Sequence, residues 1–129
     1  MRIKLSGIYV DDQQKALDFY TEVLGFKKSQ DIPVGEFRWL SLVSPEGGDT
    51  ELSLEPNANP IAKTYQDALF EQGIPINAFE VDDVDAEFAR LSEQGVAFTT
   101  EPMKAGEVKL AVFADTCGNL IQIYQRQVA

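Results

Sequence analysis

Apolar and polar positions alternate along the chain with the period of a helix in some segments and of a strand in others. Helix-like and strand-like segments follow one another in the same order in both halves of the chain. Residues 13–24 carry apolar side chains at helical spacing, and residues 84–94 repeat this pattern less regularly. Each helical stretch follows paired aspartates and ends at a glycine, which are the residues that favour the start and the end of a helix. The pattern therefore predicts two related helices, each preceded by a short apolar run typical of a strand.

Strand-like runs separated by turn residues complete each half of the chain. Strands are predicted at 3–10, 26–29, 37–43 and 51–54, and again at 76–81, 97–100, 107–114 and 120–125. A weaker helical pattern at 61–72 lies between the halves. The pattern predicts two β-α-β-β-β modules, 1–56 and 74–127, joined by a connector helix within 57–73. At 129 residues the chain is expected to form one domain, 1–129.

The two modules match at an offset of 71 residues, which carries Val10 to Val81. The same offset matches Leu5 with Ile76. Carried on to the last strand, it would match Glu51 with Gln122. A period of this size marks a duplicated supersecondary unit. Two such units are expected to enclose a shared cleft.

Several segments of the chain resemble the vicinal oxygen chelate superfamily, which includes glyoxalase I, bleomycin-resistance proteins and extradiol dioxygenases. The resemblance covers essentially the whole chain and implies an α+β fold, in which two tandem modules form a curled, half-barrel mixed sheet with helices outside. It also implies a ligand on the concave side and a homodimer. The segments that carry it are Val10-Asp11-Asp12, Ala16-Leu17-Asp18-Phe19-Tyr20, Val23-Leu24-Gly25-Phe26 and Asp115 to Gln122.

The resemblance implies four positions for metal ligands, on the first and last strands of each module. In this chain they are occupied by Leu5, Glu51, Ile76 and Gln122. Leu5 and Ile76 have no donor atom, and the sequence contains no histidine, the commonest nitrogen ligand. We therefore expect no metal and no cofactor, and a metal-dependent dioxygenase is disfavoured. The alternative is a weak site in which Glu55 or Glu80 assists the two oxygen donors.

The alternation of side chains along a strand indicates which residues share the cleft. Tyr9 is expected on the face of Leu5, and Tyr124 on the face of Gln122. Trp39 would offer a flat ring to a ligand and Arg38 would anchor a carboxylate, but neighbours on a strand cannot both face the cleft, and alternation does not decide between them. The candidate ligand-binding residues are Leu5, Tyr9, Arg38, Trp39, Glu51, Ile76, Gln122 and Tyr124.

Glu51 is the candidate catalytic residue. On an apolar floor, burial would raise the pKa of this carboxyl and make it a general base beside Gln122. The alternative is that Glu51 only hydrogen-bonds to Gln122 or to water. Cys117 lacks a histidine partner and is interpreted as structural.

Composition narrows the function classes. Eleven Lys and Arg against 21 Asp and Glu give a net charge of −10, which disfavours nucleic acid and anionic membranes as partners. No apolar run approaches the roughly 20 residues of a membrane span, and the single cysteine fits a cytoplasmic protein. Two functions stay open: binding of a small planar or apolar molecule in a metal-free cleft, or a glyoxalase-like lyase or isomerase that uses Glu51 as its base, with or without a weakly held divalent metal.

Overall fold

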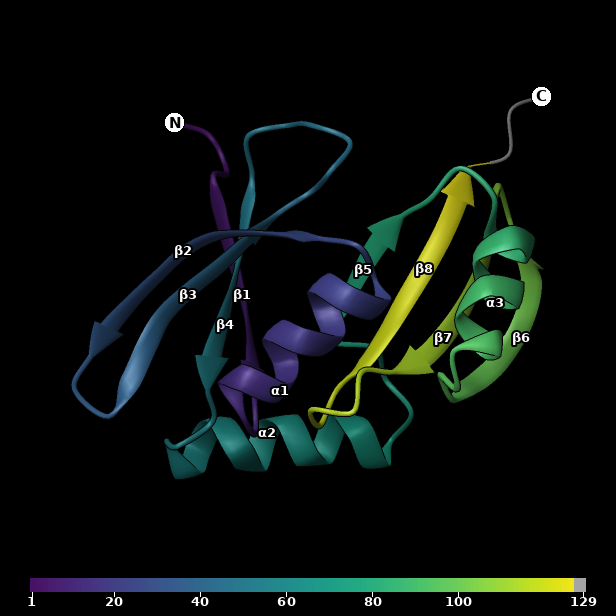
Figure 1. The fold of residues 1–129 in the computed structure, drawn as a ribbon. Coiled ribbons are helices and arrows are strands. Elements are labelled where there is room, and N and C mark those ends of the chain that lie inside the picture. The colour runs from purple at the N-terminus through teal and green to yellow at the C-terminus, as the bar shows by residue number, and fades with distance from the viewer. Residues whose placement is uncertain (127–129) are drawn as a thin grey trace. The chain divides into compact units, whose positions relative to one another are not determined.

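The computed structural model describes residues 1–126 and contains two compact units, residues 1–65 and the residues from 66 onward. Each unit contains one four-stranded sheet of mixed strand direction with a helix packed on it, which confirms the α+β class and the two β-α-β-β-β modules (Figure 1). Within the described residues neither sheet closes into a barrel. The predicted end of the second module, residue 127, lies outside the described residues. That both modules make one domain stays a prediction.

The first unit contains four strands and one helical segment. The strand order is β1-β4-β3-β2, with β1 parallel to β4 and the other neighbours antiparallel. The helix α1 packs against β3 and β4. The elements are β1 (Leu5–Val10), α1 (Gln13–Asp18) with its π-helical continuation η1 (Phe19–Val23), β2 (Lys27–Val34), β3 (Phe37–Val43) and β4 (Glu51–Pro56).

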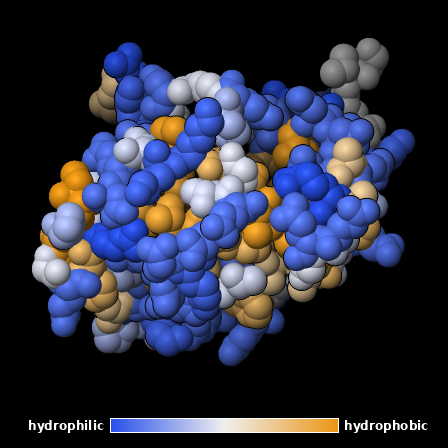
Figure 2. Space-filling view, viewed as in Figure 1, coloured by the Kyte–Doolittle hydropathy of each residue, from blue (hydrophilic) through white to orange (hydrophobic). Residues whose placement is uncertain are grey.

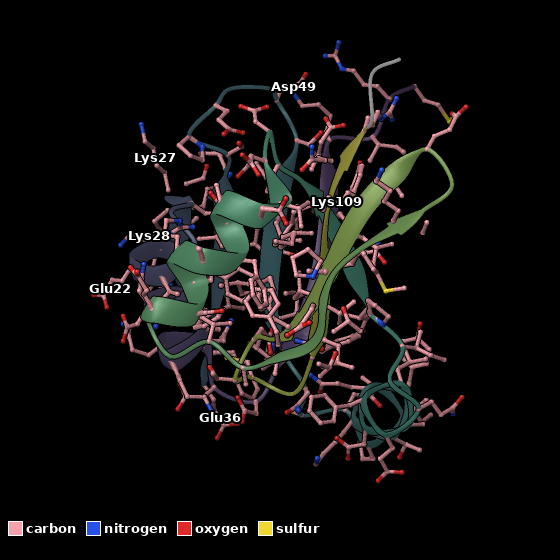
Figure 3. All side chains as sticks on the ribbon, turned by 90° about the vertical axis from the view of Figure 1, so that its right-hand side faces the viewer. Glu22, Lys27, Lys28, Glu36, Asp49 and Lys109 are labelled. Carbon is pink, nitrogen blue, oxygen red and sulfur yellow. The ribbon has the colours of Figure 1, made fainter. Side chains whose placement is uncertain are left out.

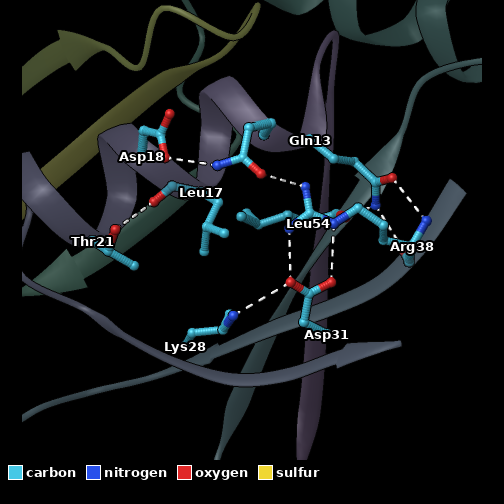
Figure 4. Close-up of polar contacts among 9 residues, drawn as sticks. Gln13, Leu17, Asp18, Thr21, Lys28, Asp31, Arg38 and Leu54 are labelled. Atoms are coloured by element: carbon cyan, nitrogen blue, oxygen red, sulfur yellow. Dashed lines mark hydrogen bonds and ion pairs between the residues drawn. The ribbon is translucent and has the colours of Figure 1, made fainter. Parts of the chain in front are cut away.

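Two side chains at the start of α1 fix this helix in place. Asp12 caps it, because its Oδ1 accepts a hydrogen bond from the backbone nitrogen of Lys15 at 3.0 Å. Gln13 is buried, and its Nε2 donates to the carbonyl oxygens of Arg38 at 2.7 Å and Leu54 at 2.8 Å (Figure 4). These bonds tie α1 to β3 and β4 on one face of the sheet.

The second unit repeats this arrangement. The strand order is β5-β8-β7-β6, and α3 packs against β6, β7 and β8. Asp83 caps α3 at the backbone nitrogen of Ala86. Lys109 of β7 forms an ion pair with Asp85 of α3, and Figure 3 shows Lys109 beside that helix. The elements are β5 (Asn77–Glu80), α3 (Val84–Glu93), β6 (Phe98–Ala105), β7 (Val108–Ala114) and β8 (Leu120–Arg126), preceded by α2 (Pro60–Glu71), which begins in the first unit.

Two strands are longer than the sequence predicted. The prediction ended them at residues 29 and 100, whereas β2 continues through Pro33 and β6 through Pro102. Proline removes a hydrogen-bond donor from the strand ladder, and the sequence therefore predicted a turn at Pro33. Both β2 and β6 are edge strands, so one side of each has no strand partner and tolerates the missing donor.

The repeat of 71 residues holds for most of the fold but fails at the last strand. Lys27–Val34 and Phe37–Val43 correspond to Phe98–Ala105 and Val108–Ala114 at this offset. The connection between β3 and β4, residues 44–50, has seven residues, but that between β7 and β8, residues 115–119, has only five. The last strand is therefore displaced by two residues, to an offset of 69.

Strand pairing identifies the true counterparts on β4 and β8. Val43 pairs with Glu51 and Ala114 pairs with Leu120, so Glu51 corresponds to Leu120. By the same register, Gln122 corresponds to Ser53. The sequence match of Glu51 with Gln122 is therefore wrong.

The short turn before β8 is held by a buried polar cluster. Asp115 Oδ1 accepts from the backbone nitrogens of Cys117 at 2.8 Å and Asn119 at 3.0 Å. Gln66, also buried, donates from Nε2 to Asn119 Oδ1 at 2.9 Å. The aspartate and asparagine of this motif thus stabilise the turn, and Cys117 is a buried free thiol within it.

One face of the molecular surface is largely hydrophilic (Figure 2). Hydrophilic residues cover most of the side of the molecule in Figure 2, with smaller apolar areas between them. In residues 1–126, no helix is both long and apolar enough to cross a membrane.

We predict that Gly118→Ala destabilises the protein more than Gly47→Ala. Both glycines have positive φ, +101° and +99°, so each alanine suffers backbone strain of about 1–2 kcal/mol. Only at Gly118 would the new Cβ lie 2.8 Å from Gln66 Nε2, whereas Gly47 has no atom within 4 Å. Urea unfolding should show an additional loss of about 1 kcal/mol or more for Gly118→Ala. Equal losses for the two variants would refute the role of the Gln66 contact.

Candidate functional site

The face of the first sheet that lies away from α1 carries most of the polar side chains of this sheet. Leu5 pairs with Glu51 and Tyr9 with Glu55 across the parallel β1–β4 ladder, so these side chains lie on one face. We call this surface the Glu51 face. Its members are Leu5, Gly7 and Tyr9 of β1, Ser29 and Gln30 of β2, Trp39 and Ser41 of β3, and Glu51, Ser53 and Glu55 of β4.

Two serines act on the carboxylate of Glu51. The hydroxyl of Ser41, which is buried, donates to Glu51 Oε1 at 2.7 Å, and Ser29 of β2 is near enough to contribute to the lowered pKa of this carboxyl. The hydrogen bond from Ser41, with smaller contributions from Ser29 and from the charge of Lys4, lowers the pKa of Glu51, and burial opposes this only in part. The expectation that burial raises the pKa of this carboxyl is therefore wrong.

Glu55 occupies space that Gly7 leaves free. Ser53, which is buried, donates from Oγ to Glu55 Oε2 at 3.2 Å. A Cβ at residue 7 would lie 2.2 Å from Glu55 Oε2 and 2.7 Å from Ser53 Oγ. Gly7 thus allows the carboxylate of Glu55 to lie over β1.

Trp39 provides the apolar part of the Glu51 face. Its indole Nε1 donates to Gln30 Oε1 at 2.8 Å, which fixes the orientation of the ring. The neighbouring apolar side chains on the hairpin of β2 and β3 are unusually exposed, with relative accessibilities of 52% for Ile32, 59% for Val34 and 41% for Phe37. Strand register assigns all three to the face of Trp39. The face therefore combines an aromatic and aliphatic surface with two carboxylates.

Arg38 lies on the opposite face of the sheet, with α1. Its Nη2 and Nε donate to the two carboxylate oxygens of Asp31 at 2.7 and 2.9 Å, and its Nη1 donates to Gln14 at 2.8 Å (Figure 4). Strand alternation did not decide whether Arg38 or Trp39 faces the cleft. In the structure, Trp39 is the one on the Glu51 face. Arg38 is engaged by an acid of its own chain and is not brought together with Glu51.

The remaining candidate residues lie in the second unit. Gln122 and Tyr124 are half-buried on the face of their sheet that lies away from α3, where they pair with Val112 and Leu110. Ile76 precedes β5, and its backbone nitrogen donates to the carbonyl oxygen of Leu120 at 2.9 Å. This face offers fewer polar groups than the Glu51 face. That the two faces line one cleft stays a prediction.

The residues at the positions implied for metal ligands do not fit a metal. Leu5 and Ile76 are aliphatic, and the corrected register replaces Glu51 by Ser53 as the counterpart of Gln122. In the part of the chain that the structure describes, no three His, Cys, Asp or Glu side chains form a group that could hold an ion. The oxygen donors of the Glu51 face are instead engaged with serines.

Sequence reasoning missed several members of the Glu51 face. Alternation along β3 from Trp39 could have identified Ser41, because the two residues are two positions apart. Ser29 and Gln30 gave no such signal, since consecutive residues on a regular strand face opposite sides. Their common placement depends on an irregularity of β2 that the sequence pattern does not reveal.

Comparison with known proteins relates the chain to one large family. A model of the Glyoxalase/Bleomycin resistance protein/Dioxygenase superfamily matches residues 2–123. The uncharacterized protein YurT of Bacillus subtilis (strain 168) is 58% identical over 127 residues, which cover 98% of this chain and 100% of YurT.

Solved structures agree with this relation. UcmS2 has a TM-score of 0.83 and 31% identity, covering 96% of this chain and 97% of UcmS2. TnmS3, an antibiotic binding protein from Streptomyces sp. CB03234, has a TM-score of 0.79 and 34% identity, covering 98% and 97% of the two chains.

We predict that the ion pair of Arg38 and Asp31 makes stability depend on pH in the acid range. The hydrogen bond from Arg38 lowers the pKa of Asp31 from 3.8 to about 2. Because the folded-state pKa is depressed, the stabilisation is present above pH 3.8 and is lost as the pH falls toward 2. Arg38→Met should return the pKa of Asp31, measured by carbon-13 NMR titration, toward 3.8. Lys28→Met is the control, since the 3.4 Å contact of Lys28 contributes less; an equal or larger effect of Lys28→Met would contradict this assignment.

Proposed function

Because the chain belongs to the Glyoxalase/Bleomycin resistance protein/Dioxygenase superfamily, we propose that it binds a small molecule with a planar or apolar body on the Glu51 face, without a metal. The observation that carries the proposal is the presence of an oriented indole and a fixed carboxylate on one sheet face. The similarity to TnmS3, an antibiotic binding protein, supports a binding role. As the family resemblance implies, we expect the binder to be a homodimer, and its acidic charge and free Cys117 fit a cytoplasmic protein.

Apolar contact supplies the main part of the expected affinity. Trp39 is half-buried, and Ile32, Val34 and Phe37 expose about half of their surfaces. Covering such side chains with a flat ring gains about 25 cal/mol for each Å² removed from water. Exposed apolar groups gathered on one face are also typical of ligand-binding surfaces.

The carboxylate of Glu51 supplies orientation. Its pKa is lowered by Ser41 and Ser29, so it is ionised at neutral pH and can accept a hydrogen bond from a ligand. Charge-assisted hydrogen bonds are about twice as strong as neutral ones. We therefore propose a ligand whose planar body carries a hydrogen-bond donor or a positive charge.

The alternative function, a glyoxalase-like lyase or isomerase, requires Glu51 to act as a base. An efficient general base has a pKa near the working pH. The pKa of Glu51 is shifted in the opposite direction, by hydrogen bonds that stabilise the ionised form. This carboxylate is better suited to hold a ligand than to accept its proton.

We predict that Glu51→Gln weakens the binding of planar cations. The variant keeps the shape of the side chain but loses its charge, so the affinity for 9-aminoacridine, measured by calorimetry and by the emission of Trp39, should fall about tenfold. Glu46→Gln, in the turn after β3, is the matched control and should bind like the wild type. If no member of a panel of planar aromatic probes alters the Trp39 emission, the proposed function is wrong.

We also predict that metal removal has no effect on this binding. Since Leu5 and Ile76, two of the four residues at the implied ligand positions, lack a donor atom, dialysis against EDTA should leave the affinity for 9-aminoacridine unchanged. Readdition of Zn²⁺ or Mg²⁺ should likewise change nothing. A loss of affinity with EDTA that a divalent ion restores would show that the binding site includes a metal.

A further inference from the structure

The edge strand β2 contains an irregularity beside the two functional groups of the Glu51 face. The pairing of β2 with β3 shifts by one residue between Lys28 and Gln30, which makes Ser29 the extra residue of a β-bulge. On a regular strand Ser29 and Gln30 would face opposite sides. Here Gln30 accepts the indole hydrogen bond of Trp39 at 2.8 Å, and Ser29, the extra residue beside it, contributes to the lowered pKa of Glu51 on the same face.

We propose that Ser29 and Gln30 are positioning residues of the binding face: the bulge directs both toward it, where Ser29 holds the carboxylate of Glu51 and Gln30 holds the ring of Trp39. Their effect on a ligand rests on the function proposed above. The positioning itself is a property of the chain and can be tested without any ligand.

The geometry gives each functional group support from more than its own strand. Glu51 stands on β4 but receives a hydrogen bond from Ser41 on β3, and Ser29 on β2 contributes to the lowered pKa of its carboxyl. Trp39 stands on β3 and is held by β2. A binding group whose rotamer is fixed in this way loses less conformational entropy when the ligand arrives, which increases affinity.

The second sheet shows what the fold alone requires at this place. β6 also shifts register, between Phe98 and Thr100, 70 residues after the shift in β2 and thus one residue short of the repeat offset. There the hydroxyls bond to the backbone of β7: Thr99 donates to the carbonyl oxygen of Val112 at 3.4 Å, and Thr100 accepts from its nitrogen at 3.0 Å. An irregularity is thus common to both units. In the first, its side chains act on Trp39 and Glu51, whereas in the second its hydroxyls bond to the backbone of β7.

Two pairs of variants test the proposal. Ser29→Ala and Gln30→Leu remove the two contacts, while Ser29→Thr and Gln30→Glu retain a hydroxyl and an acceptor. Because Trp39 is the only tryptophan, its indole N–H gives a single resonance in a nitrogen-15 NMR spectrum. Thr99→Val, at the irregularity of the second sheet, is the matched control.

We expect Gln30→Leu to shift the indole N–H resonance upfield and Gln30→Glu to restore it. Ser29→Ala should raise the pKa of Glu51 in a carbon-13 titration, and Ser29→Thr should not. Each of the two disruptive variants should weaken 9-aminoacridine binding about fivefold, the effect of losing roughly one hydrogen bond, while Thr99→Val should leave binding unchanged.

The proposal is overturned if the disruptive variants leave the indole resonance and the titration of Glu51 unchanged, or if they bind 9-aminoacridine as tightly as the wild type. Both positions are exposed, so the fold should persist; Ser29→Gly and Gln30→Met make the same test if a first variant does not fold. If the wild type itself does not bind 9-aminoacridine, that result counts against the proposed function, and the two NMR measurements decide the positioning.

Discussion

The register of β4 against its two neighbours determines which chemistry reaches the Glu51 face. β4 lies between β1 and β3, and its pairing is set by the seven-residue connection that precedes it. If the strand is displaced by two residues against its neighbours, every side chain stays on its own face of the sheet but pairs two residues further along. The second unit has this displacement, and Leu120 there occupies the position that Glu51 has in the first. The two missing turn residues thus place Leu120, and not Gln122, at the position of Glu51.

The division between the two sheet faces explains the roles of the polar residues in the first unit. On the α1 face, Gln13 ties the helix to the sheet, and Asp31 neutralises Arg38. On the Glu51 face, Ser41 and Ser53 donate hydrogen bonds to the carboxylates of Glu51 and Glu55. Within residues 1–126, neither carboxylate forms a salt bridge. The first set of contacts stabilises the fold, while the second keeps negative charge available at the surface. This difference is the physical basis for our proposal that a ligand binds on the Glu51 face.

The sequence predicted the repeated features well and the irregular ones poorly. The caps at Asp12 and Asp83 and the order of the elements follow from local signals, which the duplication supplies twice. Pro33 was misleading, because sequence alone does not show that its strand lies at a sheet edge. The bulge at Ser29 and the shortened turn before β8 escaped prediction for a related reason, since each is defined by pairing with a distant strand. The pKa of Glu51 was predicted in the wrong direction because the hydrogen bond from Ser41 and the contribution of Ser29 depend on that pairing.

In the function that we propose, Glu51 is a fixed, ionised anchor and not a base. The most direct test is a carbon-13 NMR titration of the Glu51 carboxyl in the wild-type protein without ligand. We expect a pKa below the ordinary value of 4.5, because the hydroxyl of Ser41, with a further contribution from Ser29, stabilises the carboxylate. A pKa raised above 4.5 toward neutrality would show that Glu51 is not a fixed anchor and would return it to the role of a general base.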